Sequence, residues 1–163
     1  MDWFMENIDP IKFEKARTEA EEAYKKIGDV YCPYFKEKIA FNAKGIDHIK
    51  FSRLRHARPH QDQYIRFRLI SLAQSIIRDS HTLQGISKRN NFERINTNSR
   101  WKTVMRLVTY YEFVAVINGY RVRVVIKEVD GGGGKYFWSI IPFWKMDKIT
   151  GTRLLHSGKP EID

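Results

Sequence analysis

The sequence predicts an α+β fold in which N-terminal helices pack on one face of an antiparallel β-meander sheet. Three observations lead to this prediction. Apolar residues recur at helical spacing early in the 163-residue chain, and from Trp101 onward the chain is rich in the β-branched and aromatic residues that favour strands. Asn118-Gly119 is a strong hairpin signal, because a type I′ turn needs a positive φ at both of its central residues.

The composition indicates a basic domain with enough apolar residues for a core. Hydrophobic residues make up 42% of the chain, and 29 lysines and arginines against 19 aspartates and glutamates give a formal net charge of +10. This excess favours a polyanionic partner, nucleic acid first and an anionic membrane or acidic protein second. The single cysteine, Cys32, excludes an internal disulfide framework. No apolar run has the length of a membrane span and the N-terminus lacks a signal-peptide pattern, so we expect a cytoplasmic protein with no membrane partner.

The N-terminal part predicts a helix over residues 10–27. Asp9 is suited to cap its first turn, Pro10 to begin it and Gly28 to end it. The spacing allows either an element packed on the body or a detachable arm. We divide the chain into an N-terminal helical arm over residues 1–29, an α+β domain over 30–145 and a polar C-terminal tail over 146–163.

Two short elements and one long helix are predicted before the meander. Val30 to Phe35 is interrupted by a proline and reads as an edge segment, and residues 39–41 predict a short strand. Asn42 is suited to cap a short helix that runs to about Phe51. An apolar stripe over residues 61–79 predicts a long helix packed on the core.

Two polar segments flank the long helix. RLRHARPH, residues 53–60, is the most concentrated basic loop of the chain. After the helix, the asparagine-rich KRNNFERINTNSR, residues 88–100, predicts a long mobile loop, with a short helical turn at 82–88 as one option for the residues before it.

The hairpin register follows from the two-residue turn, which places Ile117 opposite Tyr120 and alternates the two faces of the sheet from there. One face is apolar and is expected to pack on the helices. The other gathers cations, a carboxylate and a phenol, namely Arg121, Arg123, Lys127, Glu112 and Tyr110. This second face is either an ordinary solvated surface or a phosphate-binding site with acid–base groups.

The register of the last strand depends on the glycine-rich loop before it. A five-residue loop over 131–135 sets Lys127 opposite Ser139 and places Trp138 and Ile140 in the core, whereas a four-residue loop places Trp138 beside Lys127 and buries Ser139. We favour the first register, because it hides the larger apolar pair and exposes the hydroxyl. GGGGK itself lacks the spacing and the following helix of a phosphate-binding loop, and the histidines form no metal-binding spacing, so we predict no metal and no cofactor.

Scattered motifs connect the elements over about residues 30–145: CPYF…FN…G..HI, then the basic linker and the long apolar helix, then a meander ending FWSIIP-W-K. This layout resembles the broad barnase–EndoU–colicin–RelE-like class of phage and toxin ribonucleases. The resemblance implies metal-independent endonucleolytic cleavage of RNA by attack of the 2′-OH on the adjacent phosphate. It also implies tRNA as one candidate substrate and an acidic antitoxin or immunity protein as a candidate partner.

The resemblance suggests roles for individual residues, since such a site needs a base, an acid and cations for the charge that builds on the phosphorane. His48 would act as acid or base, Lys127 would stabilise the transition state and Ser139 would orient the phosphate. Arg58 and Arg123 would bind phosphate. Further nucleic-acid contacts are expected from Arg53, Arg55, His60, Glu112 (also a reserve base), Arg121, Trp144 and Lys145.

The same charges would also suffice for a non-catalytic basic nucleic-acid-binding module, because phosphate contacts alone give an affinity that falls steeply with salt. A third interpretation is an adaptor whose basic face holds an acidic protein. A ribonuclease requires turnover, whereas the binding module and the adaptor require none.

Overall fold

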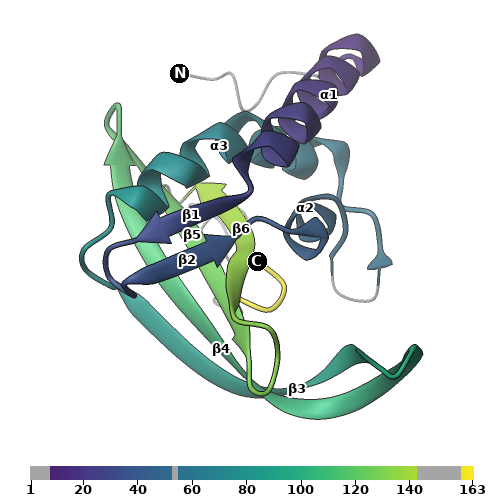
Figure 1. Cartoon of the computed structure of the whole chain (residues 1–163). Coiled ribbons are helices and arrows are strands. Elements are labelled where there is room, and N and C mark those ends of the chain that lie inside the picture. The colour runs from purple at the N-terminus through teal and green to yellow at the C-terminus, as the bar shows by residue number, and fades with distance from the viewer. Residues whose placement is uncertain (1–7, 53–54, 143–158) are drawn as a thin grey trace, which may run out of the picture.

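The computed structural model describes residues 8–52, 55–142 and 159–163. Helices and strands follow one another along these residues as shown in Figure 1. They are α1 (Pro10–Ile27), β1 (Asp29–Cys32), β2 (Glu37–Ala40), α2 (Ala43–Lys50), α3 (His60–Arg78), β3 (Gly85–Thr97), β4 (Arg100–Ile117), β5 (Tyr120–Val129) and β6 (Lys135–Pro142). The α+β class predicted from the sequence is confirmed.

The strands form one six-stranded sheet in the order β1-β2-β6-β5-β4-β3. Neighbours in this order are antiparallel except β2 and β6, which run parallel and pair through Ala40 and Tyr136. The expectation of a purely antiparallel meander is therefore wrong. The β1–β2 hairpin joins the free edge of β6, and a long crossover through α2, α3 and three strands brings the chain back in the same direction.

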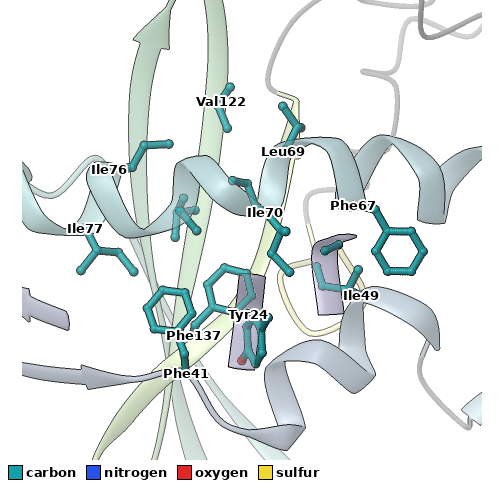
Figure 2. Packing of buried hydrophobic residues seen from close by; sticks show 14 of the residues in the cluster. Tyr24, Phe41, Ile49, Phe67, Leu69, Ile70, Ile76, Ile77, Val122 and Phe137 are labelled. Atoms are coloured by element: carbon teal, nitrogen blue, oxygen red, sulfur yellow. The ribbon is translucent and has the colours of Figure 1, made fainter. Parts of the chain in front are cut away.

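The main core lies between the sheet and helix α3, which covers one of its faces, and helix α1 packs against α3 (Figure 1). Figure 2 shows side chains of α3 meeting those of the sheet in this layer, with Ile70 among them. Helix α1 contributes Phe13, Ala16, Ala20 and Tyr24, all of which are buried. Of the two options for residues 10–27, the structure has the packed element and not a detachable arm.

The predicted helix caps are confirmed. The Asp9 carboxylate accepts a hydrogen bond from the Lys12 backbone N–H at 2.8 Å, and the Asn42 side chain accepts one from the Lys44 backbone N–H at 3.1 Å. Such bonds satisfy donors that the first turn of a helix leaves without partners. The Asn42 cap fixes the start of α2, and α2 then carries His48 toward the sheet.

The β4–β5 hairpin has the predicted turn and register. Asn118 and Gly119 have φ values of 50° and 79°, as a type I′ turn requires. Ile117 pairs with Tyr120, and the alternation continues to the pair of Tyr110 with Lys127. The apolar face of this hairpin packs in the main core, so the polar residues of both strands lie on the opposite face.

The mobile loop predicted over residues 88–100 is instead a strand, and the helical turn considered for 82–88 is also absent from the described structure. β3 pairs with β4 over all thirteen of its residues and joins it through Asn98 and Ser99, whose φ values of 52° and 62° match a second type I′ turn. This hairpin extends beyond the helices (Figure 1), and the side chains of β3 are half-buried or exposed. Without a buried face, the strand has no apolar alternation by which to recognise it.

Neither register considered for the last strand is correct, because β6 contains a bulge. Lys127 pairs with Tyr136 and Val125 with Ser139, and the shift falls between Val125 and Ile126. Trp138 is the extra residue, and it packs on the face opposite the helices instead of entering the main core as predicted. The side-chain positions are those named for the four-residue loop: Trp138 lies beside Lys127, and Ser139, which the favoured register exposes, is fully buried. Ile140 is in the main core, as expected.

None of the described helices is both long and apolar enough to cross a membrane. The structure therefore offers no helical span within residues 8–52, 55–142 and 159–163. Helix α3, the longest with 19 residues, carries charged side chains along its length.

Gly45 lies where α2 approaches the core closely, and a substitution there tests this packing. A Cβ at this position would lie 2.4 Å from the Tyr24 hydroxyl and 2.5 Å from the Phe137 carbonyl oxygen. We expect Gly45→Ala to lower the free energy of unfolding by about 1–3 kcal/mol, measured by urea denaturation, because overpacking outweighs the better helix propensity of alanine. Gly133→Ala, where nothing lies within 4 Å of the added Cβ, is the matched control. A Gly45→Ala protein as stable as the control would contradict this packing.

Candidate functional site

A groove of about 530 Å³ lies on the face of the sheet opposite α1 and α3. Helix α2 forms one wall and strands β3 to β6 form the floor and the other wall. Its lining includes Lys44, Asp47, His48, Phe51, Ser52, Arg55, Asn91, Phe92, Glu93, Arg94, Tyr110, Lys127, Tyr136, Trp138 and Glu161. The groove therefore combines cations, carboxylates, hydroxyls and aromatic rings in one hollow.

The indole of Trp138 lines this groove and contacts two other side chains of the lining. The His48 imidazole stacks on it with ring centroids 3.9 Å apart and 18° between the planes. The Lys127 ammonium lies 4.0 Å from the centroid of the same indole. The bulge in β6 thus brings together the imidazole and the ammonium that the sequence analysis selected.

Lys127 forms an ion pair in the groove. Its Nζ lies 2.8 Å from Oε1 of Glu93, which comes from the β3 strand that the sequence analysis took for a loop. Burial lowers the pKa of Lys127, and the Glu93 carboxylate opposes that shift. On the same face, the Asn91 side-chain amide donates a hydrogen bond of 3.1 Å to the Tyr110 hydroxyl.

The Tyr136 hydroxyl is buried in the groove and has no hydrogen-bond partner among the described residues. Burial raises the pKa of Tyr136, so the hydroxyl keeps its proton and is a donor. The Lys44 ammonium lies 5.4 Å from the centre of the Tyr136 ring. A buried donor without an acceptor is costly, and a ligand oxygen in the groove would satisfy it.

His48 is neutral and its Nε2 is engaged by Arg58. A guanidinium only donates hydrogen bonds, so the 3.1 Å contact from Arg58 to Nε2 makes this nitrogen an acceptor and places the ring proton on Nδ1. Burial, together with the charges of Arg58, Arg66 and Lys127, holds the pKa of His48 well below its usual 6.5. The imidazole therefore carries no charge at neutral pH.

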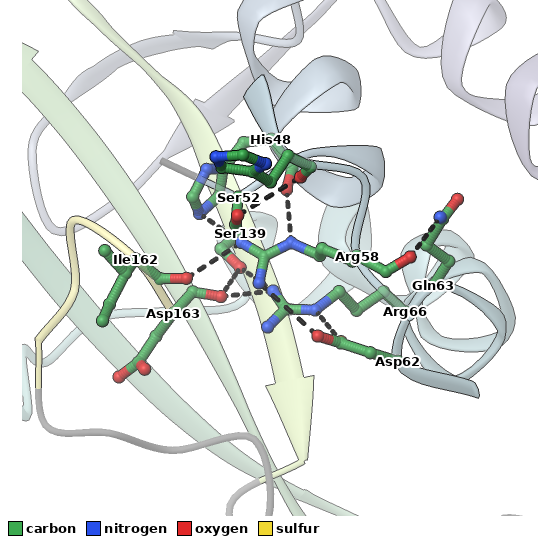
Figure 3. Close-up of polar contacts among 10 residues, drawn as sticks. His48, Ser52, Arg58, Asp62, Gln63, Arg66, Ser139, Ile162 and Asp163 are labelled. Carbon is green, nitrogen blue, oxygen red and sulfur yellow. Dashed lines mark hydrogen bonds and ion pairs between the residues drawn. The ribbon is translucent and has the colours of Figure 1, made fainter. Parts of the chain in front are cut away.

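Next to the groove, three buried arginines form what we call the arginine cluster, namely Arg58, Arg66 and Arg123. Figure 3 shows Arg58 and Arg66 entering it from the chain around the start of α3. Arg66 donates hydrogen bonds of 2.6 Å to Asp62 and of 2.6 Å to the Ser139 hydroxyl. Burial and the charge of Arg66 lower the pKa of Arg58 to about 10, so it stays charged at neutral pH.

The described C-terminal segment, residues 159–163, lies against this cluster. The Arg123 guanidinium is 2.9 Å from the Asp163 carboxylate and 2.8 Å from Glu112, and the Ser139 hydroxyl donates a 2.8 Å hydrogen bond to the Asp163 main-chain oxygen. Arg66 also donates to that oxygen. Arg58 donates to the Ile162 main-chain oxygen at 2.9 Å, as Figure 3 shows.

The predicted site residues divide into four groups. His48, Lys127 and Arg55 line the groove, whereas Arg58, Arg123, Glu112 and Ser139 belong to or contact the arginine cluster beside it. His60 stacks on Phe13 at 4.3 Å, away from both, and Arg121 is exposed near the end of the sheet. Arg53, Trp144 and Lys145 lie outside the described residues. No contact tests the functional role predicted for any of them.

Several residues of the site were missed in the sequence. Glu93 lies in a segment predicted to be a loop, and Arg66 lies within the apolar helix predicted over residues 61–79. Tyr136 was not among the predicted site residues. The contacts of Arg66 with Ser139 and Asp163 join positions 73 and 97 residues apart, so no local pattern reveals them. A charged residue inside an apolar helical stripe was the only available signal.

Among the described residues, no group of three or more histidine, cysteine, aspartate and glutamate side chains is arranged to hold a metal ion. Cys32 is buried in the main core.

The neutral, buried state of His48 predicts a pH dependence of stability. Its folded-state pKa lies below the unfolded value, so its contribution is complete above about pH 6.5 and is lost as the pH falls toward the folded-state pKa. We expect His48→Gln to reduce the slope of unfolding free energy against pH between 7 and 5.5 by up to about 1.4 kcal/mol per pH unit. Denaturation at a series of pH values measures this slope. The exposed His81→Gln is the control, and equal slopes in both variants would refute the assignment.

No protein-family model, no curated protein and no solved structure matches this chain. The resemblance to the barnase–EndoU–colicin–RelE-like ribonucleases therefore stays a prediction.

Proposed function

We propose that the chain is an endoribonuclease that cleaves RNA through attack of the 2′-OH on the adjacent phosphate, with the scissile phosphate bound in the groove. The observation that carries this proposal is the partly desolvated Lys127 ammonium, held 2.8 Å from Glu93 and against Trp138. A cation in a sheltered site stabilises the charge that develops on a phosphorane more strongly than one in water.

The Lys127–Glu93 pair supplies both proton transfers that the reaction needs. The O2′–P bond forms while the Glu93 carboxylate takes the 2′-OH proton, and the P–O5′ bond breaks while Lys127 gives a proton to the leaving 5′-oxygen. Burial lowers the pKa of Lys127, which makes it a better acid than an exposed lysine. A proton passing from Glu93 to Lys127 then restores the starting state.

The remaining groove residues support binding and orientation. The unpartnered Tyr136 hydroxyl is a donor for a phosphate oxygen. His48, whose Nε2 accepts from Arg58, is assigned here to holding the Trp138 indole, and its predicted acid–base role stays a prediction. The lining residues Phe51 and Phe92 are 41% and 68% exposed, and such rings stack on unpaired bases.

The alternative, a non-catalytic RNA-binding module, is favoured by one specific feature of the β3–β4 hairpin. Trp101 is 59% exposed on this hairpin, and the Arg94 guanidinium lies 4.8 Å from the centre of its ring. An exposed aromatic ring paired with a cation can hold a base and a phosphate without any chemistry. An acidic antitoxin or immunity protein as partner remains a prediction of the resemblance.

Lys127→Met tests the enzyme proposal. We expect it to lower the rate of RNA cleavage by about 10² or more, because it removes the charge that stabilises the transition state and the proposed acid. Gel analysis of a labelled RNA in EDTA measures the rate. Lys38→Met removes an equal charge from an exposed position on β2 and should cleave at the wild-type rate.

A second substrate separates the proposal from its alternative. RNA with a single 2′-deoxy sugar at the scissile position should resist cleavage but still bind, since the attacking hydroxyl is missing. If the folded wild-type protein cleaves neither substrate at any salt or pH, the enzyme proposal fails. Binding without turnover would then favour the module.

Trp101→Ala tests the contribution of the hairpin to RNA binding. Loss of one stacking ring is expected to weaken the affinity for single-stranded RNA by about 1–3 kcal/mol, measured by fluorescence anisotropy. Tyr31→Ala, on the opposite edge strand β1, removes a ring that is 52% exposed and serves as the matched control. Equal affinities of the two variants would show that the hairpin does not bind RNA.

A further inference from the structure

The arginine cluster gathers three buried positive charges beside the groove. Its guanidinium groups meet two carboxylates of the body, Asp62 from α3 and Glu112 from β4. The third carboxylate at the cluster is that of Asp163. Among the described residues, the ion pairs of the cluster therefore include one carboxylate from the C-terminal segment, and buried guanidinium groups of this kind strongly attract anions.

We call the segment from Lys159 to Asp163 the C-terminal strap, and several of its oxygen atoms accept hydrogen bonds or form ion pairs with side chains of the body. The Trp138 indole Nε1 donates to the Pro160 main-chain oxygen at 3.0 Å, and Arg89 lies 3.3 Å from the Glu161 carboxylate. The arginine cluster and Ser139 bind the oxygens of the last two residues. The side chains of the body are thus hydrogen-bond donors to several oxygen atoms of the strap. The phosphate oxygens of a nucleic-acid backbone could accept hydrogen bonds from the same donors.

The strap also reaches into the groove and is imperfectly held there. Glu161 lines the groove, and its Oε2 atom is buried without a hydrogen-bond partner among the described residues. A buried carboxylate oxygen without a donor costs free energy in the strapped state. This cost is removed when the strap leaves.

We infer that the C-terminal strap is a built-in mimic of RNA: its oxygens occupy a phosphate subsite, formed by Arg58, Arg66, Arg123 and Ser139, that binds a phosphodiester next to the scissile one. RNA and the strap then compete for the cluster, and RNA binding displaces the strap. This inference rests on the proposed function for the identity of the ligand. It does not depend on cleavage, so binding experiments test it separately.

Hydrogen exchange on the wild-type protein tests displacement directly. The backbone N–H groups of Ile162 and Asp163 both donate to the Lys159 oxygen, at 2.9 Å and 3.0 Å, so they should be protected in the free protein. The probe is a 2′-O-methyl oligonucleotide. Its 2′-oxygen is methylated and cannot attack the adjacent phosphate, so it is expected to bind without being cleaved. We expect exchange at residues 162 and 163 to become faster when this oligonucleotide saturates the protein. Unchanged or slower exchange in the complex would overturn the inference.

A charge variant gives a second measurement. Asp163→Asn keeps the size of the side chain but removes the charge, so the strap should release more readily and the oligonucleotide should bind about tenfold more tightly. Asp130→Asn, at an exposed position before the glycine loop, is the matched control and should keep the wild-type affinity. Thermal denaturation of both variants verifies that each is folded.

The outcomes separate the two proposals. If the protein never cleaves RNA but shows strap release and tighter binding by Asp163→Asn, the mimicry inference is supported and the endoribonuclease proposal is refuted. Weaker binding by folded Asp163→Asn would make Asp163 part of the RNA site and overturn the competition. If neither the wild-type protein nor Asp163→Asn binds the oligonucleotide at low salt, both the inference and the proposed function fail.

Discussion

Three guanidinium groups buried side by side set the main constraint on this structure. Arg66 and Arg123 are each 1% exposed and Arg58 is 7% exposed, so water cannot solvate them. Each must find oxygen partners within the protein, since removing one partner from a buried pair costs about 3–5 kcal/mol. Asp62, Glu112 and the C-terminal segment supply such oxygen partners.

The β-bulge in β6 is the second determinant of the site. A regular strand would place Trp138 and Ser139 on opposite faces of the sheet, because side chains alternate. The extra residue places both on the face opposite the helices, where Trp138 contacts Lys127 and Ser139 contacts Arg66. Because of the bulge, two consecutive residues serve two different sites. Trp138 belongs to the aromatic groove, and Ser139 belongs to the buried arginine cluster.

The parts of the fold that were predicted from the sequence are those that local chemistry specifies. The caps at Asp9 and Asn42 and the turn at Asn118-Gly119 each depend on a few neighbouring residues, and the structure has all three as expected. The polar face of the β4–β5 hairpin followed from the turn alone. These local signals placed Lys127 correctly on the face away from the helices.

The parts that could not be predicted depend on contacts between distant segments. The β3 strand has no buried face, so its polar sequence resembles a loop, and Glu93 was missed with it. The parallel pairing of β2 with β6 rests on one residue pair, Ala40 with Tyr136. No glycine or other turn-forming residue at Trp138 indicates a bulge in the sequence. The length of the glycine loop was therefore the basis for both predicted registers, and both are wrong.

His48 and Arg58 connect the two halves of the site physically. The Arg58 guanidinium donates to both the main-chain oxygen and the Nε2 of His48, at 2.9 Å and 3.1 Å, and to the Ile162 oxygen of the C-terminal segment. The His48 ring in turn stacks on Trp138 in the groove. When the C-terminal segment leaves, Arg58 loses one acceptor but keeps the two on His48, so the imidazole and the indole stay in place. An anion can therefore exchange at the cluster while the floor of the groove keeps its geometry.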